Sequence, residues 1–141
     1  MNARTQITKS QNSFRTYAFV IVGLLVIQYA LGMVANMFVQ FPATTDPGQL
    51  WEFARSQFAT GAHIIIGTLL LLGAVIFVIQ AVRQHNRSWI ASSVTGLIAI
   101  VAAFYGGVTF VSTQADEYSM VMALGFIVAF LAYGIGLYAD R

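Results

Sequence analysis

The 141-residue sequence contains no cysteine and few charged residues. Without cysteine it cannot form disulfide bonds, thiolate zinc sites, Cys-ligated iron–sulfur clusters or a covalent c-type haem attachment. Only 9% of the residues are charged, whereas an ordinary soluble domain has about 25%. With 58% hydrophobic residues the chain cannot cover itself with a water-facing surface, and a net charge of +2 gives no basic patch for nucleic acid. The composition therefore indicates an integral membrane protein.

The sparse charges separate four uncharged windows, each long enough for one membrane-spanning helix of about 20 residues. Helices are expected rather than strands, because backbone polar groups in hydrocarbon must pair within their own segment. We predict an all-α, integral membrane four-helix bundle in which residues 1–141 form a single transmembrane domain. The predicted helices cover residues 17–40, 58–82, 89–112 and 119–138.

Positive charges are distributed unequally between the two predicted sides of the membrane. Six of the seven cations flank one side, and the positive-inside rule makes that side cytoplasmic. We therefore expect a multi-pass protein of the cell membrane with both termini cytoplasmic and with external loops at residues 41–57 and 113–118. The six cations are Arg4, Lys9, Arg15, Arg83, Arg87 and Arg141.

The longer external loop, residues 41–57, carries the signals of a short helix. Asp46 can cap a helix N-terminus, Pro47 suits the first helical position, and Gln49 stands where a capping-box partner is found. Trp51 and Phe53 make the segment amphipathic. We predict a short interfacial helix that leads into the helix at 58–82.

Polar side chains inside the spans mark candidate sites, because each one costs free energy in hydrocarbon. His63 is the only acidic or basic side chain within a predicted span, and Gly67 lies one turn later on the same helix face. A histidine beside a glycine leaves a flat space for a planar macrocycle with imidazole as axial ligand. We predict that haem b is bound there, with His63 as the metal ligand. The structural alternative is that His63 hydrogen-bonds across the bundle to Asn36, Thr109 or Tyr105.

No second histidine lies within a span, so a second axial ligand would have to be a thioether. Met122 and Met120 lie near the external end of the last helix, although methionine is also a common filler of apolar gaps. Arg55, the only external cation, could pair with haem propionates or anchor the interface. His85, in the cytoplasmic loop, is interpreted as a solvated residue. The remaining predicted cofactor-binding residues are Gln28, Asn36 and Tyr105.

These residues predict a small haem-binding membrane protein that transfers electrons, senses haem or delivers it. Two alternatives remain open: a non-catalytic structural or assembly subunit of a larger membrane complex, and a quinone or small-molecule carrier that uses Gln28, Asn36 and Tyr105. No pattern of hydrolytic residues is present, and no catalytic residue is assigned. The expected partners are the lipid bilayer and a homodimer or larger membrane complex, and no nucleic acid is expected.

In layout, the chain resembles one four-helix half of the heme A synthase family. The resemblance rests on Gln28–Gly32 late in the first helix, on the long external loop with its aromatic segment, and on His63–Gly67 at the start of the next helix. Members of that family consist of two such halves, and histidines on the second and fourth helices of each half ligate haem near the external face. The resemblance implies an axial-ligand position for His63.

The sequence also departs from the family pattern. Ile64 follows His63 where the family usually has arginine, and the nearest glutamate before it is Glu52. The histidine of the last helix is replaced by Met120 or Met122, and the external cysteine pair and the glutamate of the first helix are absent. The resemblance therefore implies a haem ligand at His63 but not the haem-oxidising activity of the family.

Overall fold

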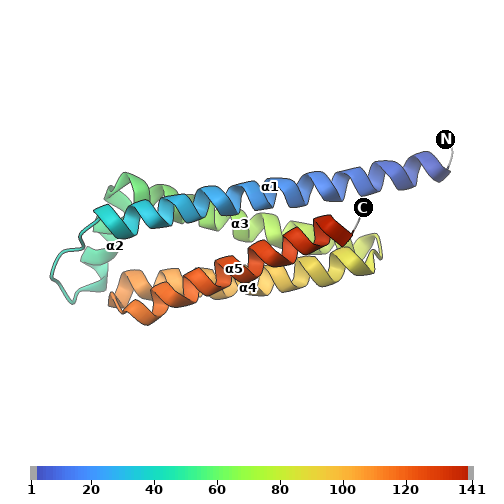
Figure 1. Ribbon diagram of the computed structural model, residues 1–141. Helices are drawn as coiled ribbons and strands as arrows, with labels where there is room; N and C mark the ends of the chain where they lie inside the picture. Colours follow the sequence, from blue (N-terminus) through green and yellow to red (C-terminus); the bar gives the residue numbers. More distant parts are fainter. Residues whose placement is uncertain (1–2, 140–141) are drawn as a thin grey trace.

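The computed structural model describes residues 3–139, with side chains from residue 13 onward, and it is all-helical over that range. Arg4, Lys9 and Arg141, used above for the orientation, lie outside the described side chains. Four of the five helices are long and apolar enough to cross a membrane, as predicted, which indicates a multi-pass membrane protein. The helices are α1 (Ala3–Phe38), α2 (Pro47–Ser56), α3 (Phe58–Arg83), α4 (Arg87–Thr113) and α5 (Asp116–Ala139) (Figure 1).

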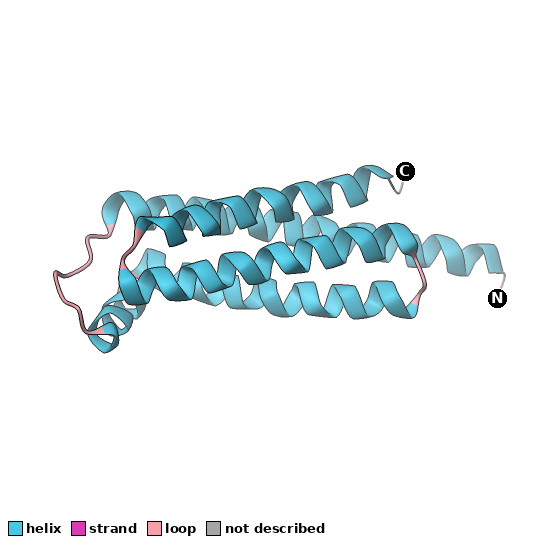
Figure 2. Cartoon of the chain, turned by 90° about the horizontal axis from the view of Figure 1, so that it is seen from below, coloured by secondary structure: helices cyan, strands magenta, loops and turns pink. Residues whose placement is uncertain are grey.

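The four long helices form an elongated bundle in which each has two main neighbours (Figure 2). The neighbouring pairs are α1 with α3, α3 with α4, α4 with α5, and α5 with α1. The short α2 lies at one end of the bundle together with the α4–α5 turn, and the α3–α4 turn lies at the other end (Figure 1). We call these the α2 end and the α3–α4 turn end.

Three helix starts differ from the prediction, and that of α4, at Arg87 rather than residue 89, differs least. The first helix begins at Ala3 rather than residue 17, and it ends at Phe38 rather than residue 40. The prediction marked only the apolar part, but the polar residues before it include no glycine or proline that would break a helix. The last helix begins at Asp116 rather than residue 119, and its first turn carries Asp116 and Glu117, which the partial positive charge of a helix N-terminus favours.

The predicted short helix is present as α2, with Asp46 as its N-cap and Pro47 in its first turn. The Asp46 carboxylate accepts a hydrogen bond of 2.8 Å from the backbone N–H of Gly48. The N–H of Asp46 donates to the hydroxyl of Thr44 at 3.2 Å, so Thr44 takes the place expected for Gln49. The helix packs against α3 and α4.

A hydrogen bond fastens α2 to α4: Nε1 of Trp51 donates to Oγ of Ser112 at 3.0 Å. We expect Trp51→Phe to lower the free energy of unfolding by about 0.5–1.5 kcal/mol, the usual net value of one hydrogen bond. Unfolding in a detergent–SDS titration, followed by circular dichroism, measures the change. Ser112→Ala should add nothing further once Trp51 is replaced; full additivity of the two changes would show that the bond does not contribute.

Small residues allow α4 and α5 to pack more extensively than any other pair. A methyl group added at Gly125 would lie 2.7 Å from the carbonyl oxygen of Ala99 and 2.8 Å from Cβ of Ala103. Farther along the same interface, the ring of Tyr133 occupies the space beside Gly96. The backbones of the two helices therefore touch directly at Gly125.

An aromatic cluster joins all four long helices at the α3–α4 turn end. Phe14 of α1, Phe77 of α3, Trp89 of α4 and Tyr133 of α5 are all buried. The ring centroid of Phe77 lies 5.9 Å from that of Phe14, 5.5 Å from that of Trp89 and 5.8 Å from that of Tyr133. This end of the bundle is therefore filled with side chains, and the open space lies elsewhere.

Candidate functional site

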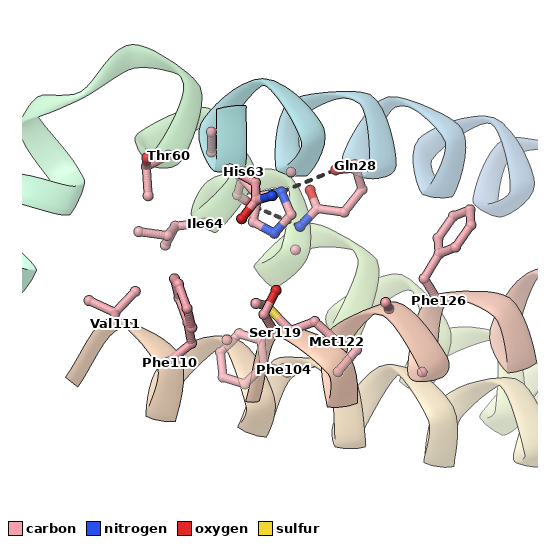
Figure 3. Close-up of a pocket in the computed structure, with 18 of the residues that line it drawn as sticks. Gln28, Thr60, His63, Ile64, Phe104, Phe110, Val111, Ser119, Met122 and Phe126 are labelled. Atoms are coloured by element: carbon pink, nitrogen blue, oxygen red, sulfur yellow. Dashed lines mark hydrogen bonds between the residues drawn. The ribbon is translucent and has the colours of Figure 1, made fainter. Parts of the chain in front are cut away.

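A cavity of about 410 Å³ lies inside the bundle toward the α2 end, between the α1–α3 pair and the α4–α5 pair (Figure 3). Apolar side chains form most of its wall. Leu25, Leu70, Ile100 and Ala129 limit it on the side of the aromatic cluster. Its polar wall residues are Gln28, Asn36, Thr60, His63, Gln114 and Ser119.

Two reciprocal hydrogen bonds between α1 and α3 fix the position of His63. Its Nδ1 lies 3.1 Å from the backbone carbonyl oxygen of Gln28, and Nε2 of Gln28 donates to the carbonyl of His63 at 2.9 Å. Figure 3 shows both bonds as dashed lines. We call this arrangement the Gln28–His63 pair. It corrects the structural alternative considered from the sequence, in which Asn36, Thr109 or Tyr105 was the partner of the imidazole.

Each side chain of the Gln28–His63 pair packs against a glycine of the opposite helix. A methyl group at Gly32 would lie 3.0 Å from Cε1 of His63, and one at Gly67 would lie 3.0 Å from Nε2 of Gln28. Gly67 therefore lines the cavity, but the space beside it is taken by Gln28 rather than left open for a macrocycle. The prediction of a flat open space beside Gly67 is therefore wrong, because Gln28 of the neighbouring helix α1 fills that space.

The hydrogen bond to Gln28 determines which nitrogen of His63 is free. A carbonyl oxygen can only accept a hydrogen bond, so Nδ1 carries the proton and Nε2 keeps its lone pair. Nε2 has no hydrogen-bond partner among the described side chains, residues 13–139, and it is turned toward the cavity (Figure 3). Histidines that bind metals are typically held in this way, with one ring N–H bonded to a backbone carbonyl or a carboxylate.

Met122 faces His63 from the opposite wall of the cavity, together with Ser119 (Figure 3). A methyl group at Gly107 of α4 would lie 3.2 Å from its sulfur, so Gly107 leaves room for the thioether. Ser119, Gly107 and Thr60 were not predicted as site residues. Thr60 precedes His63 and Ser119 precedes Met122 by three residues, and this helical spacing could have identified both.

Three predicted site residues lie outside the cavity. Met120 is 67% exposed, since two residues along a helix from Met122 is more than half a turn away. Tyr105 is 62% exposed and contacts Tyr118 instead. Arg55 is exposed and donates through Nε to the carbonyl of Trp51 at 3.2 Å, within its own helix.

Two buried polar atoms of the cavity wall have no hydrogen-bond partner within the described part of the chain. They are Oε1 of Gln28 and Oγ1 of Thr60. Buried polar atoms are normally paired, so these two are unsatisfied hydrogen-bonding groups in residues of the cavity wall.

Among the side chains of residues 13–139, no three His, Cys, Asp or Glu gather as a metal site. A porphyrin supplies four donor atoms itself and needs only an axial ligand, such as His63, from a protein. Comparisons of the chain with protein-family models, curated proteins and solved structures found no match.

Proposed function

We propose that this chain binds b-type haem in the cavity, with Nε2 of His63 as an axial ligand, and that it transfers electrons, senses haem or handles it. The hydrogen bond between Nδ1 of His63 and the Gln28 carbonyl supports the proposal most directly, because it leaves Nε2 free on the cavity wall. The apolar wall favours a large planar apolar cofactor and excludes water. Bound haem would supply reversible one-electron chemistry.

The other residues of the site have supporting roles in this proposal. Met122 would be the second axial ligand, since its thioether faces the same cavity. Asn36, Gln114 and Ser119 are the polar side chains available to the haem carboxylates, because no Lys or Arg within residues 13–139 lines the cavity. Gly32 and Gly67 keep the Gln28–His63 pair in place.

The orientation belongs to the same proposal. Arg15, Arg83 and Arg87 lie toward the α3–α4 turn end, and Asp46, Glu52, Asp116 and Glu117 lie toward the α2 end. By the positive-inside rule, the α2 end and the haem face the outside of the cell membrane, and both termini are cytoplasmic.

A haem titration tests the proposal. Protein purified in detergent should bind haem with a sharp Soret band that saturates at one haem per chain. Met122→Leu should then convert the spectrum to that of a five-coordinate haem, and Met120→Leu should leave it unchanged, because Met120 lies outside the cavity. If the sharp Soret band of bound haem does not appear even with excess haem, the proposal is contradicted. Copurification of such haem-free protein with other membrane subunits would support an assembly role.

The second candidate is a carrier of a quinone or another small molecule. The unpaired Oε1 of Gln28 and Oγ1 of Thr60 favour it, since a small rotation of either side chain would let it hydrogen-bond to a polar ligand head. A short-chain ubiquinol should quench the fluorescence of Trp51 in a Trp89→Phe background and compete with haem. A carrier should keep this binding in His63→Gln, whereas haem binding should be lost.

A further inference from the structure

Aromatic side chains lie at both ends of the cavity. At the α2 end, the ring of Phe41 packs edge-on against Phe53 and Phe110, with centroids 5.4 and 6.2 Å apart. Toward the α3–α4 turn end the aromatic cluster fills the bundle. The route into the cavity is therefore expected between two of the long helices.

Two of the four sides of the bundle are held together by direct contacts at the depth of the cavity. The Gln28–His63 pair joins α1 to α3. A methyl group at Gly106 would lie 2.9 Å from the carbonyl oxygen of Tyr118, so α4 and α5 are in backbone contact there. The α2 helix packs against both α3 and α4 at the α2 end of the gap between them, whereas the part of the cavity wall on α4 includes the exposed residues Phe104 and Val108.

The side between α1 and α5 has no covering element. These helices diverge toward the α2 end (Figure 1), and α2 does not bridge them. Tyr29 and Phe126 stack with centroids 4.9 Å apart and form the inner edge of the opening. Beyond this stack, the cavity wall includes the exposed residues Met33 and Asn36 of α1 and Ala123 of α5.

We infer that the ligand of this cavity enters and leaves sideways, between α1 and α5, from the lipid phase. The ligand is therefore a membrane-dissolved, largely apolar molecule, a class that includes haem. Ala123 leaves the opening free of bulk, and the unbranched side chain of Met33 can move aside. The inference rests on the proposed function only in requiring that the cavity holds a ligand.

The absence of native cysteine allows a direct test with introduced thiols. Met33→Cys/Ala123→Cys, cross-linked by a short bis-methanethiosulfonate, should load haem from phosphatidylcholine vesicles at least tenfold more slowly, and reductant should restore the rate. The control is Glu52→Cys/Thr113→Cys, whose positions adjoin the bonded Trp51 and Ser112 and which should load normally when cross-linked. Slow loading in the control pair with normal loading in the α1–α5 pair would overturn the inference.

A second measurement does not depend on haem. Ser119→Cys, a thiol on the cavity wall, should react faster with an alkyl maleimide dissolved in the vesicle membrane than with a charged methanethiosulfonate in water. Ala123→Trp should slow the first reaction by filling the opening. Faster labelling by the aqueous reagent overturns lateral access even if haem binds, whereas failure of every variant to bind haem, with maleimide labelling as expected, overturns the haem proposal alone.

Discussion

Alanine at position 63 is expected to abolish the Soret absorption of the haem-loaded protein. His63 is the only histidine that lines the cavity, and no cluster of other ligands among the side chains of residues 13–139 could replace it. The fold should survive, because the lost hydrogen bond to Gln28 contributes about 0.5–1.5 kcal/mol. The measurement is an absorption titration with haem, accompanied by a thermal unfolding curve that shows the variant is folded.

The chain supplies a matched control in its second histidine. His85 is exposed at the α3–α4 turn, with φ of 52°, at the end of the bundle away from the cavity. His85→Ala should keep the full Soret band, and added imidazole should restore it in His63→Gly. An unchanged Soret band in His63→Ala would contradict the assignment of the axial ligand.

A second large effect is expected at Gly125, where one methyl group should destabilise the bundle. The added methyl group would meet the carbonyl oxygen of Ala99 and Cβ of Ala103. The first is a backbone atom and the second is fixed to the backbone, so neither can rotate away. Overpacking of this kind costs about 1–3 kcal/mol, so Gly125→Ala should unfold at a lower SDS fraction than the unmodified protein. Circular dichroism follows the unfolding.

Gly134, on the same helix, is the control for this prediction. A methyl group there would meet nothing within 4 Å, and alanine has a higher helix propensity than glycine by about 1 kcal/mol. Gly134→Ala should therefore be neutral or stabilising. Equal destabilisation by both substitutions would show that the direct contact of α4 and α5 at Gly125 is not responsible.

The sequence was sufficient to predict the number of spanning helices and the approximate position of their apolar parts, because so few charges interrupt the apolar windows. The predicted range 58–82 differs from α3 by one residue at its end, and Asp46-Pro47 marked the start of α2 correctly. These features depend on local composition and capping, which can be recognised without knowing how helices pack.

Side-chain partners were harder to predict, since they depend on which helix faces which. Tyr105 was predicted as a cofactor-binding residue, yet its side chain is exposed and does not line the cavity. The partner of His63 is a backbone carbonyl, and every residue has one, so no search for polar side chains could have found it. Met120 and Met122 were not distinguished because the rotation of α5 about its axis was unknown.

The aromatic cluster at the α3–α4 turn end has a mechanical consequence. The cluster of Phe14, Phe77, Trp89 and Tyr133 joins all four long helices at one end of the bundle. The helices are therefore held together most firmly there, and that end acts as a hinge. A ligand larger than the cavity must push apart the ends of the long helices at the α2 end. Strain from such a ligand would then reach the α1–α2 and α4–α5 connections first and leave the hinge undisturbed.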